Sequence, residues 1–157
     1  MTAQQQKPVL ILGGGFTGLF AAIHLRQQQK SLPIVLVDKN NRFIFKPLLY
    51  DFLSSEVQLD MAWPSYDELL SNRDITFVED SVQDIDLIAQ QVTLKSQLAY
   101  EYEYLVLALG GVTGYFGVAG AQGTHLAFAM PKMPLIWANI CVNVCSRPVK
   151  SPQIISL

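Results

Sequence analysis

Near the start of the chain, two short apolar runs enclose a longer segment with helical periodicity. The runs Val9–Leu12 and Ile34–Val37 have the length and composition of buried strands. Between them, apolar residues recur at the spacing of one helix face: Leu19, Ala22, Ile23 and Leu25. The second run ends on an acidic residue, Asp38. This order predicts a βαβ unit, in which two parallel strands are joined by a helix.

An aromatic loop and a short helix follow the βαβ unit. The loop FIFKPLLYDFL contains Pro47, which disfavours helical backbone at Lys46, whereas residues 48–53 can begin a helix. Taken alone, the loop either lines a flat ring system or closes the core beneath the sheet as a hydrophobic staple. Residues 64–70 predict a second short helix, with Ser65 as N-cap and Glu68 completing a capping box.

The next part of the chain has the periodicity of strands. Asp74–Val78 predicts a third parallel strand. Residues 82–86, 91–94 and 99–102 predict a small antiparallel meander. Tyr104–Leu109 is continuously apolar, which predicts a core strand buried on both faces. The predicted fold class is therefore α/β, a Rossmann-like parallel sheet with a meander inserted before its last strand.

The turn between the first strand and the helix reads GGGFTG, residues 13–18. Gly13 permits a sharp turn, Gly15 lets the backbone approach a pyrophosphate, and Gly18 allows close packing of helix on strand. The N–H groups that begin the helix would then face the phosphates. Glycine turns also occur in units that bind nothing, but this one lies between strand and helix. That context favours a dinucleotide site.

Asp38 lies twenty positions after Gly18, at the end of the second strand. At this offset a carboxylate can accept hydrogen bonds from both hydroxyls of an adenosine ribose. The same negative charge would repel a 2′-phosphate, which argues against NADP at this site.

Composition narrows the possible functions further. The 157 residues are 50% hydrophobic and 15% charged with a net charge of −2, which excludes a disordered chain and a basic nucleic-acid-binding field. The longest apolar stretches, near 104–109 and 134–145, are too short to span a bilayer. The polar segment 1–7 predicts no signal peptide. The only cysteines, Cys141 and Cys145, suit a reducing cytoplasm and lack the further ligands of a metal site.

Four features in order carry a family resemblance: the GGGFTG turn, Asp38, the loop RFIFKPLLY and the strand end YLVLALGG. Together they resemble the N-terminal part of the type II NADH dehydrogenases. These are single-chain FAD enzymes of the flavoprotein class with two dinucleotide-binding domains. The chain looks most like cyanobacterial members, some of which act as demethylphylloquinone reductases. The resemblance extends from Lys7 to Phe128, which is only the first part of a family member.

The resemblance implies roles for individual residues. The turn would hold the FAD pyrophosphate, Asp38 with Lys39 the adenosine ribose, and the backbone of Val82 the adenine. The segment after Phe45 would run beside the isoalloxazine ring, and the strand end would pass the cofactor with Leu109 in place of the family's threonine. The implied cofactor-binding residues are Gly13, Gly14, Gly15, Phe16, Thr17, Gly18, Asp38, Lys39, Lys46, Pro47, Leu48, Val82, Ala108, Leu109 and Gly110.

In such enzymes NAD(P)H delivers a hydride to the flavin, which passes two electrons to a quinone. The cofactor carries the chemistry, so no catalytic acid or base is assigned. His24, on the first helix, is expected to be a surface or packing residue. The resemblance places the protein in the cytoplasm, or at the cytoplasmic face of a membrane that family members reach through a C-terminal region absent from this chain.

The end of the chain departs from the family. Residues 1–128 form the predicted, partial FAD/NAD(P)-binding domain, and residues 129–157 form a proline-containing tail without clear periodicity. Back-translated and read from the third base of each codon, residues 129–145 can encode an amphipathic helix like the one the family places there. We hypothesise that a frameshift truncated the protein. The alternatives are a non-catalytic FAD- or NAD-binding module and an inactive remnant.

Overall fold

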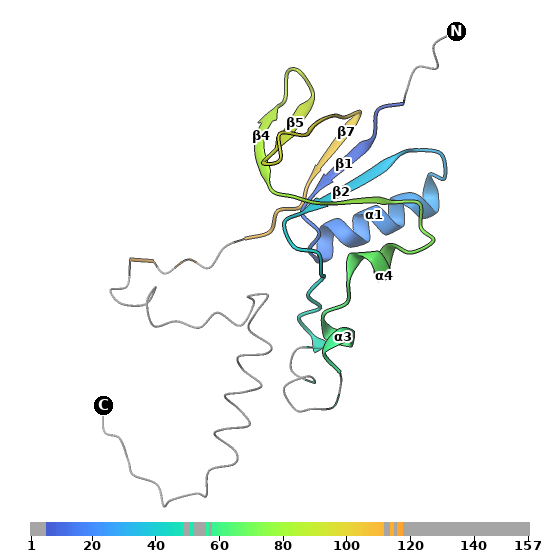
Figure 1. The fold of residues 1–157 in the computed structure, drawn as a ribbon, viewed down its shortest axis with the longest axis vertical. Helices are drawn as coiled ribbons and strands as arrows, with labels where there is room; N and C mark the ends of the chain where they lie inside the picture. Colours follow the sequence, from blue (N-terminus) through green and yellow to red (C-terminus); the bar gives the residue numbers. More distant parts are fainter. Residues whose placement is uncertain are drawn as a thin grey trace, which may run out of the picture. The chain divides into compact units, whose positions relative to one another are not determined.

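The computed structural model describes residues 6–48, 51, 56, 58–111, 114, 116 and 117. The chain divides into two compact units, the first formed by Met1–Phe45 with Trp63–Val112 and the second by Lys46–Ala62 with Thr113–Leu157. All described strands lie in the first unit (Figure 1). In the second unit, the helix α3 spans Leu59–Ala62.

A four-stranded parallel sheet forms the centre of the first unit. Its strand order is β3-β2-β1-β7, so that β1 lies between β2 and β7 (Figure 1). The helix α1 connects β1 to β2, which confirms the predicted βαβ unit. The bounds are β1 Val9–Leu12, α1 Phe16–Gln28, β2 Ile34–Asp38, β3 Thr76–Glu79 and β7 Tyr104–Leu107.

The predicted short helix and meander are also present. In α4, the Ser65 hydroxyl accepts a hydrogen bond from the Glu68 N–H and the Glu68 carboxylate accepts one from the Ser65 N–H, as expected for a capping box. The meander is a three-stranded antiparallel sheet of order β4-β5-β6. The bounds are α4 Tyr66–Leu70, β4 Val82–Asp86, β5 Gln91–Leu94 and β6 Ala99–Glu101.

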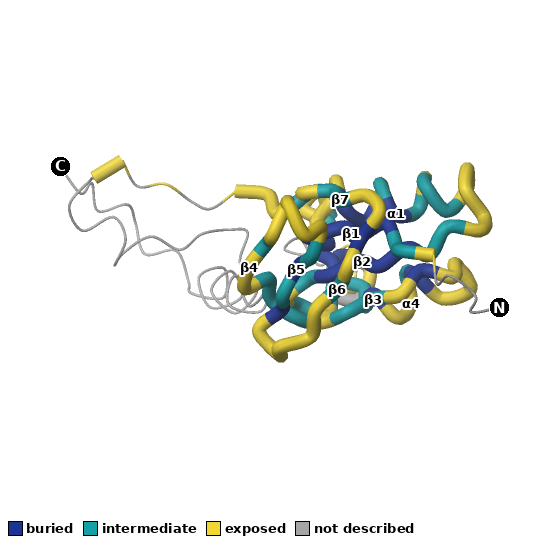
Figure 2. Tube along the Cα trace, turned by 90° about the horizontal axis from the view of Figure 1, so that it is seen from above, coloured by how far each residue is buried: buried dark blue, intermediate teal, exposed yellow. Residues whose placement is uncertain are grey.

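The parallel sheet is covered on both faces, which explains why β1 is apolar at every position. Val9 and Ile11 pack against α1 and α4 on one face. Leu10 and Leu12 pack against the meander on the other face, where the fully buried Val92 lies. Figure 2 shows the buried residues concentrated along β1 and β2. Side chains alternate between the faces of a strand, so every position of β1 is removed from water.

β7 differs from the expectation that it is buried on both faces. Tyr104 is 61% exposed and Leu107 is 60% exposed, and the strand ends at Leu107 rather than Leu109. The prediction was wrong because, among the described strands, β7 pairs only with β1 and so forms an edge of the sheet. Apolar residues show only that a strand would be stabilised by burial. Whether it is buried depends on a strand or helix that packs beside it.

The start of the third strand also differs from the prediction. β3 begins at Thr76, not at Asp74. Asp74 has a φ of 51° and Asn72 a φ of 60°, so the chain passes through left-handed backbone before it enters the sheet. Asn and Asp tolerate this conformation better than most residues, which favours a turn here.

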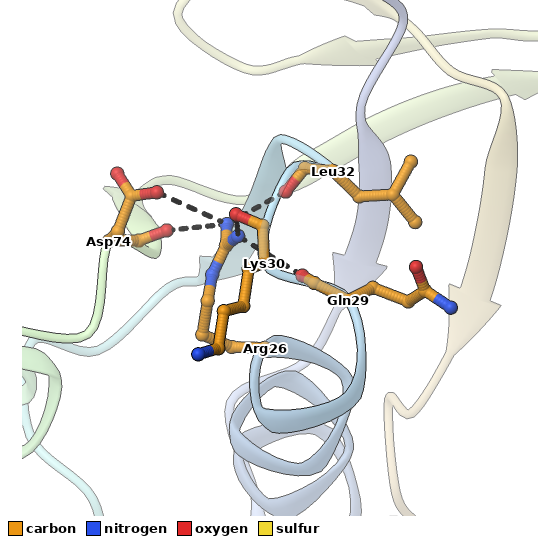
Figure 3. A network of polar contacts seen from close by, with 5 residues as sticks. All are labelled: Arg26, Gln29, Lys30, Leu32 and Asp74. Atoms are coloured by element: carbon orange, nitrogen blue, oxygen red, sulfur yellow. Dashed lines mark hydrogen bonds and ion pairs between the residues drawn. The ribbon is translucent and has the colours of Figure 1, made fainter.

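Arg26 joins the end of α1 to the two segments that lead into β2 and β3 (Figure 3). Its guanidinium donates to four main-chain carbonyl oxygens, those of Gln29 at 3.2 Å and of Lys30, Leu32 and Asp74 at 2.7 Å each. The Arg26 side chain is only 13% exposed, and its bond to the Leu32 carbonyl is partly buried. A positive charge near the C-terminus of a helix also interacts favourably with the negative end of the helix dipole.

Replacing Arg26 by lysine is expected to lower the free energy of unfolding by about 2 kcal/mol, because an ammonium group has three donors and no planar fork. The matched control is Asp74→Asn. This substitution removes the ion pair between Arg26 and the Asp74 carboxylate, which are 3.6 Å apart, and leaves the Asp74 main-chain carbonyl in place. The Asp74 side chain is 89% exposed. The control should change stability by less than about 0.5 kcal/mol. Urea denaturation of both variants measures the difference, and equal losses would contradict the role assigned to the carbonyl bonds.

Several predicted features lie outside the described residues. They include the domain boundary at residue 128, the tail with Cys141 and Cys145, and most of the helix expected from residue 48. No helix within the described ranges is long and apolar enough to cross a membrane.

Candidate dinucleotide site

The glycine turn follows β1 at the point where the sheet reverses its direction of growth. From β1 the chain goes to β2 and β3 on one side, whereas β7 lies on the other side of β1. In open α/β sheets, ligands bind beyond the carboxyl ends of the strands at such a switch point. The end of β1 is tied to both neighbours, since Gly13 N–H donates to the Val37 carbonyl at 2.7 Å and Ala108 N–H to the Leu12 carbonyl at 2.8 Å.

Gly13, Gly18 and Ala108 pack together as the floor of the turn. Gly13 has a φ of +100°, and a Cβ there would overlap the Ala108 carbonyl. A Cβ on Gly18 would overlap the Gly13 carbonyl oxygen and lie 3.3 Å from the Ala108 Cβ. The turn and packing roles predicted for Gly13 and Gly18 agree with these contacts. Ala108, predicted to contact the cofactor, lies against both glycines and must itself stay small.

Gly15 faces open space instead. No atom of the described residues outside its chain neighbours lies within 4 Å of a Cβ built on Gly15. Gly15 is the N-cap of α1, and because glycine has no side chain, no cap side chain accepts from the first N–H groups of the helix; its first turn also contains no acidic residue. Gly15, Phe16 and Thr17 are exposed. The helix therefore begins with N–H groups directed at an open cradle, which fits a pyrophosphate.

The Asp38 carboxylate is oriented by three donors. Its Oδ2 accepts from the Gly14 N–H at 2.6 Å, and its Oδ1 accepts from the Asn40 N–H at 2.8 Å and the Asn40 Nδ2 at 3.1 Å. A carboxylate offers about four acceptor positions. One position is thus directly open to a ribose hydroxyl, and binding of both hydroxyls requires the Asn40 amide to move. Lys39, beside Asp38, is exposed.

Tyr66 is a site residue that the sequence analysis missed. Its ring is 2% exposed, stacks on Phe77 with centroids 4.3 Å apart, and its hydroxyl donates to the Gly14 carbonyl at 2.6 Å. Burial, and next the negative charge of Asp38, raises the pKa of the Tyr66 phenol far above its usual value. The capping box predicted that α4 begins here, but no local signal connects Tyr66 to a glycine 52 positions away.

Val82 lies where its backbone is open to a ligand. It pairs with Leu94, whose N–H and carbonyl are bonded on the other side to Leu98 and Gln97, while Lys95 N–H donates to Ser81. Val82 and Leu94 therefore form a non-hydrogen-bonded pair. The N–H and C=O of Val82 point away from β5, toward the edge of the three-stranded sheet, as backbone contacts to adenine would require.

The aromatic loop divides between the two alternatives. Phe43 is buried in the core on the α1 face, as the hydrophobic-staple alternative describes. Phe45 is half-buried, with its ring centroid 6.4 Å from that of Phe16 beside the glycine turn. Lys46, Pro47 and Leu48 belong to the second unit, and their contact with a flavin ring stays a prediction.

The remaining residues of the predicted site lie on the surface. Leu109 is 61% exposed, and Gly110 has a φ of +72° in the segment that leaves β7. His24 is exposed on α1, and its ring nitrogen Nδ1 lies 3.0 Å from the Phe20 carbonyl oxygen, as expected for a surface residue. Within the described residues, no cluster of three or more His, Cys, Asp or Glu side chains could hold a metal ion.

Comparison with known proteins agrees with this geometry. The sequence model of the pyridine nucleotide-disulphide oxidoreductases matches residues 7–132. The chain belongs to this family.

Relatives within the family are quinone oxidoreductases. The chain is 39% identical over 137 residues to the alternative NAD(P)H-ubiquinone oxidoreductase C1 of Arabidopsis thaliana, covering 76% of this chain and 26% of the relative. It is 37% identical over 128 residues to the demethylphylloquinone reductase NdbB of Synechocystis, covering 76% of this chain and 32% of that relative. The chain therefore spans about a quarter to a third of the length of these relatives.

Solved structures of oxidoreductases share the fold. The sulfide:quinone oxidoreductase of Aquifex aeolicus superposes with a TM-score of 0.78 at 26% identity, covering 90% of this chain and 33% of that one. NDH2 of Plasmodium falciparum superposes with a TM-score of 0.74 at 20% identity, covering 94% and 31%. The α/β fold of this chain is thus shared with both of these structures.

Proposed function

We propose that this chain is the FAD-binding part of an NAD(P)H:quinone oxidoreductase of the type II NADH dehydrogenase kind. One observation carries the proposal: the open cradle at Gly15 lies at the end of β1, next to the carboxylate of Asp38. The similarity to two quinone oxidoreductases supports the class of reaction. The quinone and NAD(P)H are partners of the whole protein in this proposal, as is its location at the cytoplasmic face of a membrane.

The residues of this chain bind and orient the cofactor. The N–H groups at the start of α1 bind the pyrophosphate, and Gly15 leaves room for it. Asp38 accepts a ribose hydroxyl on Oδ2, held in direction by the Gly14 N–H. The outward N–H and C=O of Val82 bind the adenine edge. When bound, FAD supplies the hydride acceptor and the electron transfer to the quinone.

A second candidate is a dinucleotide-binding module without turnover. It is favoured by the single GxGxxG sequence among these 157 residues, since NAD(P)H requires a site of its own. Both candidates predict FAD binding at this turn. Only the first candidate takes part in NADH oxidation. We expect the 157-residue chain alone not to oxidise NADH.

The test is nucleotide binding to the purified chain. FAD should bind weakly, as measured by the change of its fluorescence on titration with the chain, and ADP should compete with it. Adenosine 2′,5′-bisphosphate should bind at least about tenfold more weakly than AMP, which carries the same 5′-monophosphate, because the 2′-phosphate faces Asp38, and Asp38→Asn should narrow that gap. A chain that binds neither FAD nor ADP would overturn the proposal. NADH-dependent quinone reduction by the chain alone would exclude the module without turnover.

A further inference from the structure

A continuous chain of hydrogen bonds joins α4, the glycine turn and β2. The Tyr66 hydroxyl donates to the carbonyl of Gly14, and the N–H of Gly14 donates to Asp38 Oδ2, each at 2.6 Å. The backbone of one glycine is therefore held on both sides, by a buried phenol and by the carboxylate predicted to bind the ribose.

The position of Tyr66 is itself fixed from the Asp38 side. Its N–H donates to the Asn41 carbonyl at 3.1 Å, and the Phe43 N–H donates to the Pro64 carbonyl at 2.9 Å. The loop that leaves β2 is thus paired with the start of α4. The stacking on Phe77, a β3 residue, holds the ring from the other side. The phenol reaches Gly14 from a rigid frame that includes the neighbourhood of Asp38.

Space around Gly14 is as restricted as its hydrogen bonding. A Cβ on Gly14 would overlap the Tyr66 hydroxyl oxygen and lie 2.6 Å from the Tyr66 Cζ and 3.1 Å from the Asp38 Cβ. The middle glycine of the turn is therefore required by Tyr66 and Asp38, not by the ligand cradle. This separates Gly14 from Gly15, whose Cβ position is open.

We propose that Tyr66 is a positioning residue of the dinucleotide site, which holds the backbone at Gly14 and through it directs the Asp38 carboxylate toward the adenosine ribose. The inference rests on the proposed function and deepens it. Tyr66 does not contact the ligand; it acts through Gly14. Because burial raises its pKa, the Tyr66 phenol is protonated at neutral pH and donates. Loss of the hydroxyl would leave the Gly14 carbonyl without this donor and free the Gly14–Gly15 peptide, which contains that carbonyl, to rotate.

The experiment compares the affinity for ADP with that for 2′-deoxy-ADP. The two ligands differ only in the 2′-hydroxyl of the ribose, from which the Asp38 carboxylate is proposed to accept a hydrogen bond. We expect the unsubstituted chain to bind ADP at least about tenfold more tightly, as a hydrogen bond to a charged group implies. In Tyr66→Phe the ratio of the affinities for ADP and 2′-deoxy-ADP should fall to about threefold or less, because the Asp38 carboxylate is no longer held in one orientation. In an Asp38→Asn background, Tyr66→Phe should not change the ratio further. The matched control is Tyr102→Phe, at a buried tyrosine in the core on the opposite face of the sheet.

The outcomes are distinct. If Tyr66→Phe weakens both nucleotides equally, Tyr66 is merely structural and the inference is overturned, while the proposed function stands. If the unsubstituted chain binds no ADP, the proposed function fails and the inference with it. Should Tyr66→Phe not fold, Phe77→Leu keeps the hydroxyl but loosens the ring, and an unchanged ratio in that variant would overturn the inference.

Discussion

Replacing Gly18 by alanine is expected to lower the free energy of unfolding by about 3 kcal/mol. At an ordinary helical position the same change would stabilise the protein by about 1 kcal/mol, because alanine is the better helix former. Here the added methyl group would overlap the Gly13 carbonyl oxygen, which is backbone and is fixed by the turn. It would also lie 3.3 Å from the Ala108 Cβ, so α1 cannot shift toward β7 to relieve the overlap.

Urea denaturation followed by circular dichroism measures this loss. A shortening of Ala108 is no remedy, because the main overlap is with backbone rather than with a side chain. Gly18→Ala combined with Ala108→Gly should therefore recover little of the stability. Gly18→Ala with unchanged or increased stability would mean that α1 does not pack on the turn as closely as described.

Replacing Gly15 by alanine should have the opposite profile: a folded protein that no longer binds the nucleotide. The Gly15 backbone has φ −59° and ψ −172°, a negative φ at the margin of the extended region that alanine can reach at small cost, and the described residues leave its Cβ position open. The loss of a glycine N-cap and the lower entropy of the unfolded chain oppose each other, so stability should change by less than about 1 kcal/mol.

The added methyl group would nonetheless occupy the cradle in which the pyrophosphate is proposed to lie. We expect the affinity for ADP, and for FAD, to fall by at least about tenfold, which corresponds to about 1.4 kcal/mol. Isothermal titration calorimetry on Gly15→Ala measures this. Unchanged ADP affinity in a folded Gly15→Ala protein would remove the cradle from the proposed site.

Gly15 and Gly18 belong to one sequence motif but are proposed to serve different purposes, ligand binding at Gly15 and folding at Gly18. Both lie in the GGGFTG turn, and sequence alone assigns each a role by its place in the pattern. The structure distinguishes them by what surrounds each Cβ: backbone for Gly18, and no described contact for Gly15. A glycine motif can therefore contain positions required for folding beside positions required only for the ligand.

Elements with a local signal could be predicted from the amino-acid sequence. The apolar runs of β1 and β2, the helical spacing of α1 and the Ser65 capping box each depend on residues a few positions apart, and each is observed. The order of these elements also predicted the parallel sheet and the inserted meander, because short connections leave few topologies. The family resemblance likewise rested on short motifs read along the chain, and the family match bears it out.

Contacts between residues distant in sequence became known from the fold. Tyr66 and Gly14 are 52 positions apart, and no periodicity or propensity encodes their hydrogen bond. The exposure of β7 could not be read from its apolar residues, because burial depends on which strands lie beside it. The four carbonyl contacts of Arg26 likewise arise where the ends of α1 and the loops to β2 and β3 converge. Local patterns specify elements, whereas contacts between elements follow from the packing that brings them together.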